Sequence, residues 1–96
     1  MDPQTMFDIR EVRVVVTGGG GVLCGGMARG LAALGARVAV VDLIEEKAQK
    51  VVDDIRDAGG DAYAVVCDVT DPASVAAARD AVLRQWGTVD VLLNGA

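Results

Sequence analysis

The chain has 96 residues, enough for one small domain that buries roughly 60–70% of the surface its unfolded chain exposes. Hydrophobic residues make up 52% of the chain and charged residues 24%, as in folded proteins. A formal charge of −5 excludes the clustered basic surface that nucleic acid requires. No apolar run approaches the ~20 residues of a membrane span. We therefore expect neither a nucleic-acid partner nor a membrane partner.

The residue content also argues against a metal site, a disulfide and a leader peptide. The chain has no histidine, and Cys24 and Cys67 lack the spacing of zinc ligands. We interpret both as reduced, buried small residues of a cytoplasmic protein. The segment 1–4 has no basic region followed by an apolar one, so we expect no signal peptide.

Four short runs rich in valine and alanine predict buried strands. They cover residues 12–17, 37–41, 62–67 and 89–93. Apolar residues at helical spacing lie between these runs and predict three helices. These residues are Leu23, Met27, Leu31 and Leu34 in the first helix, Ala48, Val51, Val52 and Ile55 in the second, and Val75, Ala78, Val82 and Trp86 in the third. Asp71 as an N-cap, with Pro72 in the first turn, predicts the start of the third helix.

This alternation with short connections predicts an α/β fold, a Rossmann-type three-layer arrangement around a parallel sheet. We expect an incomplete version with four strands in the order 3-2-1-4 and three helices. A flavodoxin-like strand order shares the alternation, but the glycine loop after the first strand favours the dinucleotide-binding version. The last strand would leave an apolar edge unpaired, so we expect the chain alone to associate or to be poorly soluble.

Four consecutive glycines, residues 18–21, join the first strand to the first helix. Glycine lets the backbone approach a diphosphate without Cβ clashes, and the unpaired N–H groups of a helix N-terminus attract the anion. The candidate cofactor-binding residues in this segment are Gly18, Gly20, Gly21, Val22 and Leu23. A flexible turn is the alternative, and the flanking strand and helix favour nucleotide binding.

Asp42 ends the second predicted strand. A carboxylate there can accept hydrogen bonds from both hydroxyls of an adenosine ribose, and it would repel a 2′-phosphate. No Lys or Arg lies within residues 18–25, so the sequence favours NAD over NADP. Asp42 is also placed to cap the second helix, and the two roles can coexist because both use the same strand end.

The loop that begins at Thr17 and Gly18 resembles the Thr-Gly-x-x-x-Gly-x-Gly motif of the short-chain dehydrogenase/reductase family. Val22 and Cys24 stand at the second and third glycine positions of that motif. Val22 brings a Cβ close to the expected diphosphate, and Gly21 can supply the missing backbone freedom.

Three later segments resemble the same family, in its order and spacing across residues 12–96. Asp68-Val69 resembles the pair that contacts adenine in the family, and an Asx turn leading to the Asp71 cap is the alternative. Asn94-Gly95-Ala96 resembles the Asn-Asn-Ala-Gly segment near the nicotinamide ribose, with Gly95 in place of the second asparagine. A plain turn at the strand end is the alternative there. Trp86-Gly87 resembles the aromatic-glycine pair that precedes this strand.

The resemblance implies an NAD-dependent oxidoreductase that interconverts an alcohol and a ketone. The run Gly-Gly-Gly-Gly-Val-Leu-Cys together with Asn-Gly-Ala is similar to the mannonate (fructuronate) oxidoreductase branch. That branch commonly has valine at the second loop glycine. The implied partner is a small molecule, a hydroxy or keto sugar acid or a polyol, and the full-length protein is expected to be a homo-oligomer.

Family members use a serine and a Tyr-x-x-x-Lys pair for catalysis. The sole tyrosine, Tyr63, is followed four residues later by Cys67, and the sole serine, Ser74, lies in the third predicted helix. We therefore assign no catalytic residue and interpret residues 1–96 as an NAD-binding Rossmann segment that is inactive by itself. The alternatives are a non-catalytic nucleotide-binding module and an NADP-dependent reductase of another branch.

Overall fold

The computed structural model describes residues 8–95, so the interpretation of residues 1–4 and the candidate Ala96 lie outside the described residues. The strands are β1 (Arg13–Thr17), β2 (Arg37–Asp42), β3 (Asp61–Val66) and β4 (Val91–Asn94). The helices are α2 (Val22–Ala33), α3 (Glu45–Asp57) and α4 (Pro72–Trp86). The predicted alternation of strands and helices is confirmed.

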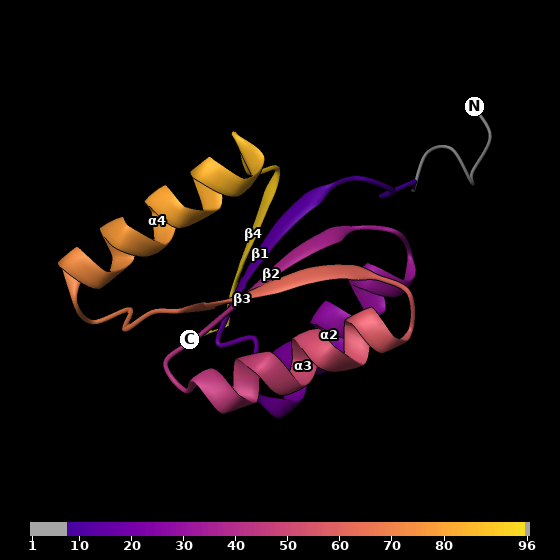
Figure 1. The fold of residues 1–96 in the computed structure, drawn as a ribbon, viewed down its shortest axis with the longest axis horizontal. Coiled ribbons are helices and arrows are strands. Elements are labelled where there is room, and N and C mark those ends of the chain that lie inside the picture. The colour runs from indigo at the N-terminus through magenta and orange to yellow at the C-terminus, as the bar shows by residue number, and fades with distance from the viewer. Residues whose placement is uncertain (1–7, 96) are drawn as a thin grey trace.

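The strands form one parallel sheet in the order β3-β2-β1-β4. Helices α2 and α3 lie side by side on one face of the sheet, and α4 lies on the other (Figure 1). These three layers and this strand order are those of a Rossmann-type fold, as the sequence predicts. All four carboxyl ends of the strands meet at one edge, which is where ligands bind in open parallel sheets.

The core lies between the sheet and the layer of α2 and α3, and β1 and β2 contribute most of its valines. The predicted inward face of α3 is confirmed, because its four residues are all buried. For α2 the predicted row is only partly inward: Leu31 packs against the core, whereas Leu23 is 76% exposed and Leu34 is 64% exposed. The buried residues of α2 are instead Gly25, Ala28 and Ala32. These small residues let α2 approach the sheet and α3 closely; a Cβ at Gly25 would lie 3.2 Å from Val51 Cγ2.

Helix α4 covers its face of the sheet less completely. It begins as predicted, because the Asp71 side chain accepts a hydrogen bond from the Ala73 amide and Pro72 occupies the first turn. Only Val82 of its inner face is buried. Between α4 and the sheet lies a cavity of about 330 Å³ whose wall is almost wholly apolar. At the far end of the helix, Trp86 meets the ring of Tyr63 edge-on, with centroids 5.2 Å apart.

Strand β4 begins at Val91, two residues later than predicted. Asp90 explains the later start, because its carboxylate accepts a hydrogen bond from the Arg13 amide at 2.9 Å. Its own amide donates to the Arg13 carbonyl at 3.0 Å, which joins the start of β4 to the start of β1. One edge of β4 has no partner strand in residues 8–95, and Leu92 of this strand, which lines the cavity under α4, is 62% exposed.

Among residues 8–95, no helix combines the length and the apolar character needed to cross a bilayer.

Candidate functional site

The carboxyl ends of β1, β2 and β3 open onto a pocket of about 200 Å³. Four residues predicted separately from the sequence line it together: Gly18, Asp42, Asp68 and Val69. They come from three strand ends that are distant in sequence and adjacent in the sheet. The neighbouring residues Val41, Leu43, Cys67 and Thr70 complete the wall. The pocket therefore has two carboxylates at its rim and an apolar interior.

The glycine loop wraps tightly over the end of β1. Gly18 adopts a φ of 66°, in the left-handed region that glycine enters without strain. Gly20 lies so close to α3 that a Cβ there would be 2.7 Å from Lys47 Cβ and 2.9 Å from Asp42 Oδ2. No side chain fits in that space without moving the loop, so the backbone itself forms the surface of the cradle.

Helix α2 presents an uncapped N-terminus to the same edge. Its N-cap, Gly21, makes no side-chain capping bond, and the first turn holds no acidic residue. The first intrahelical bond runs from the Gly25 amide to the Gly21 carbonyl, so the amides of Val22, Leu23 and Cys24 precede it. By contrast, α3 has two glutamates in its first turn and α4 has the Asp71 cap. The positive end of α2 is thus left for an external anion.

Val22 begins α2 beside this anion site. It is 97% exposed, so its side chain packs against no part of the loop. Gly21 precedes it in an extended conformation, with φ −74° and ψ 170°, which any residue can adopt. The loop therefore accommodates valine at the second motif position without backbone strain at Gly21.

Asp42 joins the pocket to the glycine loop. Its Oδ2 accepts a hydrogen bond from the Gly20 amide at 3.0 Å, and its Oδ1 accepts one from the Ile44 amide at 2.9 Å. The predicted helix cap is not formed: the N-cap of α3 is Ile44, which makes no side-chain capping bond, and Asp42 instead forms an Asx turn just before the helix. A carboxylate has about four lone-pair positions, so two remain for hydroxyl donors. The residue can therefore hold the loop and bind a ribose simultaneously.

Asp68 is held by its own turn. Its Oδ1 accepts hydrogen bonds from the Thr70 hydroxyl at 2.6 Å and the Thr70 amide at 2.9 Å. These two bonds hold the pKa of Asp68 below its ordinary value, so the group stays ionised. The Asp68 amide donates to Ser74 Oγ at 2.9 Å. The Asx turn considered as an alternative is therefore present, and it directs a charged acceptor to the pocket rim.

The β4 side of the site contains Asn94 and Gly95. Thr17, at the end of β1, donates a hydrogen bond from its hydroxyl to Asn94 Oδ1 at 3.0 Å. The Gly95 amide donates to Thr17 Oγ1 at 3.1 Å and to the Thr17 carbonyl at 3.2 Å. Because β1 lies between β2 and β4, this corner is separated from the pocket that holds Asp42 and Asp68. The predicted residues thus form two groups, one on each side of the α2 N-terminus.

Sequence reasoning missed two residues that fix these groups. In the sequence Thr17 is only the first residue of the loop motif, whereas in the structure its hydroxyl bonds both Asn94 and Gly95. The sequence predicts Ser74 only as a residue of the third helix, whereas in the structure its hydroxyl oxygen accepts a hydrogen bond from the Asp68 amide. Both contacts lie outside the range of a local Ser/Thr turn motif, so no local sequence signal marks them. Both cysteines are free thiols, with Cys67 buried and Cys24 half-buried. Within residues 8–95, no group of three possible metal ligands gathers.

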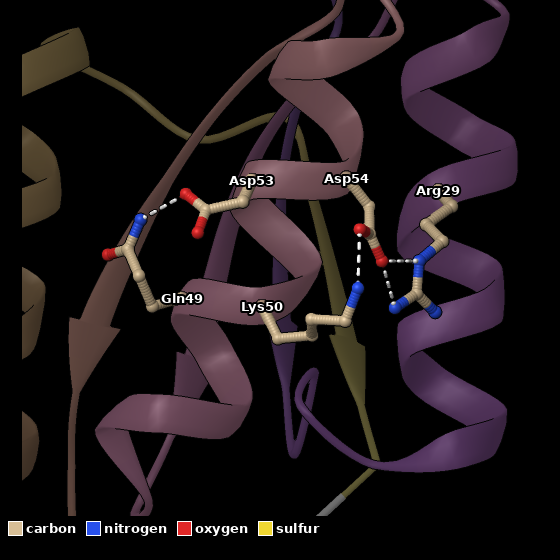
Figure 2. A network of polar contacts seen from close by, with 5 residues as sticks. All are labelled: Arg29, Gln49, Lys50, Asp53 and Asp54. Atoms are coloured by element: carbon tan, nitrogen blue, oxygen red, sulfur yellow. Dashed lines mark hydrogen bonds and ion pairs between the residues drawn. The ribbon is translucent and has the colours of Figure 1, made fainter.

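Behind the site, an ion-pair network fixes α2 against α3 (Figure 2). Arg29 of α2 donates from Nη2 to Asp54 Oδ2 of α3 at 2.8 Å, and Lys50 Nζ reaches Asp54 Oδ1 at 2.9 Å. The bonds from Lys50 and Arg29 hold the pKa of Asp54 below its ordinary value. The helix that presents the uncapped N-terminus is therefore anchored by charge as well as by its small-residue face.

Comparison with known proteins decides the family. The sequence pattern of the short chain dehydrogenases matches residues 12–96. The chain belongs to the short-chain dehydrogenase family. This short-chain dehydrogenase sequence is 51% identical over 82 residues to UxuB, an uncharacterised oxidoreductase of Bacillus subtilis, and the match covers 85% of this chain and 30% of UxuB.

Two solved structures of short-chain dehydrogenases bear on the cofactor. A putative D-mannonate oxidoreductase from Haemophilus influenza with bound NAD matches with a TM-score of 0.89 and 34% identity, over 99% of this chain and 34% of that one. A metagenomic short-chain oxidoreductase in complex with NADP matches with a TM-score of 0.80 and 36% identity, over 86% of this chain and 38% of that one. The chain thus spans about a third of the length of these relatives.

Proposed function

We propose that this chain is the cofactor-binding segment of an NAD-dependent oxidoreductase that interconverts an alcohol and a ketone. The observation that carries the proposal is Asp42, a carboxylate with free acceptor positions at the rim of the pocket. In the proposed complex it accepts hydrogen bonds from the ribose hydroxyls of adenosine, while its negative charge repels a 2′-phosphate.

The remaining candidate residues take consistent roles around that contact. The loop glycines Gly18, Gly20 and Gly21 and the first-turn amides at Val22 and Leu23 hold the diphosphate. Asp68 accepts a hydrogen bond from the exocyclic amine of adenine, and Val69 packs on the adenine ring. Asn94 and Gly95, with Ala96 after them, border the nicotinamide half. The cofactor supplies hydride transfer, and the chain supplies its binding and orientation.

We propose a sugar acid or polyol as substrate, of the mannonate/fructuronate type. The support is the likeness to a putative D-mannonate oxidoreductase with bound NAD. The chain by itself is proposed to bind cofactor without turnover, because its sole tyrosine is followed four residues later by Cys67 instead of lysine. The full-length protein is proposed to be a cytoplasmic homo-oligomer; the two free thiols fit a reducing compartment.

NADP is the second candidate cofactor, because a related oxidoreductase of the same fold holds it. The sequence favours NAD, because the position directly after Asp42 is Leu43 and not a basic residue that would pair with a 2′-phosphate. A non-catalytic nucleotide-binding module would use the same pocket. An assay of the full-length protein with D-mannonate, following NADH formation, separates the enzyme from that module.

Titration calorimetry of the chain with NAD⁺ and NADP⁺ tests the cofactor assignment. Loss of a charge-assisted contact costs roughly 1.5–3 kcal/mol, so Asp42→Ala is expected to weaken NAD⁺ binding by at least about tenfold. The same change is expected to reduce the difference in binding affinity between NAD⁺ and NADP⁺. Asp53→Ala, an exposed carboxylate on the outer face of α3, is the matched control and should change neither affinity. Tighter binding of NADP⁺ by the wild type would overturn the preference for NAD.

A further inference from the structure

Two departures from the family motifs meet in space. Cys24 stands where the loop motif has a glycine, and Gly95 stands where the strand-end segment has an asparagine. A Cβ built on Gly95 would overlap the Cys24 Sγ atom. The large and small residues have therefore exchanged places: the thiol fills the space that a side chain at position 95 would need.

The backbone around Gly95 has little room to relieve such an overlap. Its amide donates to both oxygens of Thr17, at 3.1 and 3.2 Å, so the segment cannot move outward without breaking those bonds. The same added Cβ would also lie 3.0 Å from the Thr17 carbonyl oxygen, which is tighter than ordinary contact. By contrast, it would lie 3.4 Å from Cys24 Cβ, a distance that needs no adjustment. The sulfur atom is therefore the main obstacle to a side chain at position 95, and the Thr17 carbonyl needs only a shift of a few tenths of an ångström.

This contact joins the first turn of α2 to the end of β4. In the proposed complex the diphosphate lies at the α2 N-terminus and the adenosine lies over β2 and β3. The other nucleoside of the dinucleotide then has to extend across β1 toward β4. It reaches the corner formed by Asn94 and Gly95, whose position relative to α2 is set by the Cys24 thiol.

We propose that Cys24 is a positioning residue for the β4 side of the dinucleotide site, acting through its steric fit with Gly95. The inference rests on the proposed function for the identity of the ligand. The fit fixes the distance between the α2 first turn and the Asn94 segment. It does not affect the pocket on the other side of β1, which holds the adenosine in the proposed complex.

Titration calorimetry with NAD⁺ and ADP as separate probes tests this, because ADP occupies only the adenosine and diphosphate positions. Overpacking costs ~1–3 kcal/mol, so Gly95→Ala is expected to weaken NAD⁺ binding about tenfold and to change ADP binding less than about twofold. Cys24→Ala removes only the sulfur. In the double variant Cys24→Ala/Gly95→Ala, NAD⁺ affinity is expected to return to within about threefold of wild type.

Cys24→Ser is the matched control, since it keeps an atom at the γ position. The Cys24→Ser/Gly95→Ala variant is expected to remain impaired for NAD⁺, and thermal melting should show the same pattern of loss and rescue. Equal losses of ADP and NAD⁺ binding in Gly95→Ala would overturn the positioning role. Failure of Cys24→Ala to rescue would overturn the steric pair. If the wild type binds neither ADP nor NAD⁺, the proposed function itself fails and this inference with it.

Discussion

The Gly20 amide donates a hydrogen bond to Asp42 Oδ2 at 3.0 Å. Through this bond the carboxylate at the end of β2 also holds the glycine loop that follows β1. The two features that the sequence suggests as separate ligand contacts are therefore one structural unit. A disturbance of the loop is expected to move the carboxylate, and the reverse also holds.

Gly20→Ala is expected to lower both stability and NAD⁺ affinity. The new Cβ would lie 2.7 Å from Lys47 Cβ, so the loop or α3 must shift. Such overpacking costs ~1–3 kcal/mol of unfolding free energy. Chemical denaturation followed by circular dichroism, with calorimetry for NAD⁺, measures both effects. Gly26→Ala is the control: a Cβ there meets nothing within 4 Å, so helix propensity should stabilise the chain by up to ~1 kcal/mol. Equal changes in stability and NAD⁺ affinity in the two variants would contradict the close approach of Gly20 to Lys47.

Asp54→Asn is expected to lower the melting temperature at neutral pH by weakening the contact between α2 and α3 (Figure 2). The bonds from Lys50 and Arg29 hold the pKa of Asp54 below 3.8, so this stabilisation is present above about pH 4 and is lost as the pH falls through the lowered pKa. Melting curves across this range measure it. Asp53→Asn is the control, because among the described residues Asp53 bonds only Gln49 of its own helix. A pH-independent difference between Asp54→Asn and wild type would rule out the ionic origin.

Tyr63→Phe is expected to stabilise the chain at neutral pH and to reduce the loss of stability at alkaline pH. The Tyr63 hydroxyl is buried without a hydrogen-bond partner among the described residues, and removing such a group gains about 1 kcal/mol. Burial, with a smaller contribution from the Asp61 charge, raises the pKa of Tyr63 from 10.0 to about 12. Because the folded state disfavours the ionised phenol, this group costs no additional stability below pH 10. The folded state loses stability as the pH rises from 10 toward 12. Parallel melting profiles of the two proteins above pH 10 would refute the burial of the hydroxyl.

The chain is expected to self-associate through the unpaired side of β4, and Leu92→Lys is expected to shift it toward monomer. A charge on an edge strand opposes pairing with a second strand. Light scattering should give a mass above 9.9 kDa for the wild type and a lower mass for the variant. Leu34→Lys is the control, since Leu34 is equally exposed but lies at the end of α2. A monomeric wild type with one cooperative unfolding transition would contradict this expectation.

The topology was predictable because it depends on local patterns that repeat. Valine-rich runs, the Asp71 cap and the apolar face of α3 all specify structure within a few residues. The inward face of α2 was not predictable in the same way. Its leucines follow helical spacing, but close packing on the sheet selects Gly25, Ala28 and Ala32, and hydrophobicity alone does not rank small residues above large ones.

The site residues were predictable where a strand end and a side-chain type coincide. Gly18, Asp42 and Asp68 meet as the parallel topology requires. The contacts that hold them were not predictable, because they join residues far apart in the chain. Thr17 bonds Asn94, and Cys24 fills the space beside Gly95. Such complementarity depends on distances of a few tenths of an ångström, and a one-dimensional pattern does not contain them.

The edge-on contact of Tyr63 with Trp86 has a practical consequence for anyone who studies this protein in solution. They are the chain's sole tyrosine and sole tryptophan, and their centroids are 5.2 Å apart. Excitation energy absorbed by the phenol passes to the indole at that range, so the emission spectrum reports whether α4 is docked. The pair lies outside the ligand pocket, so this optical signal separates detachment of that helix from occupancy of the binding edge.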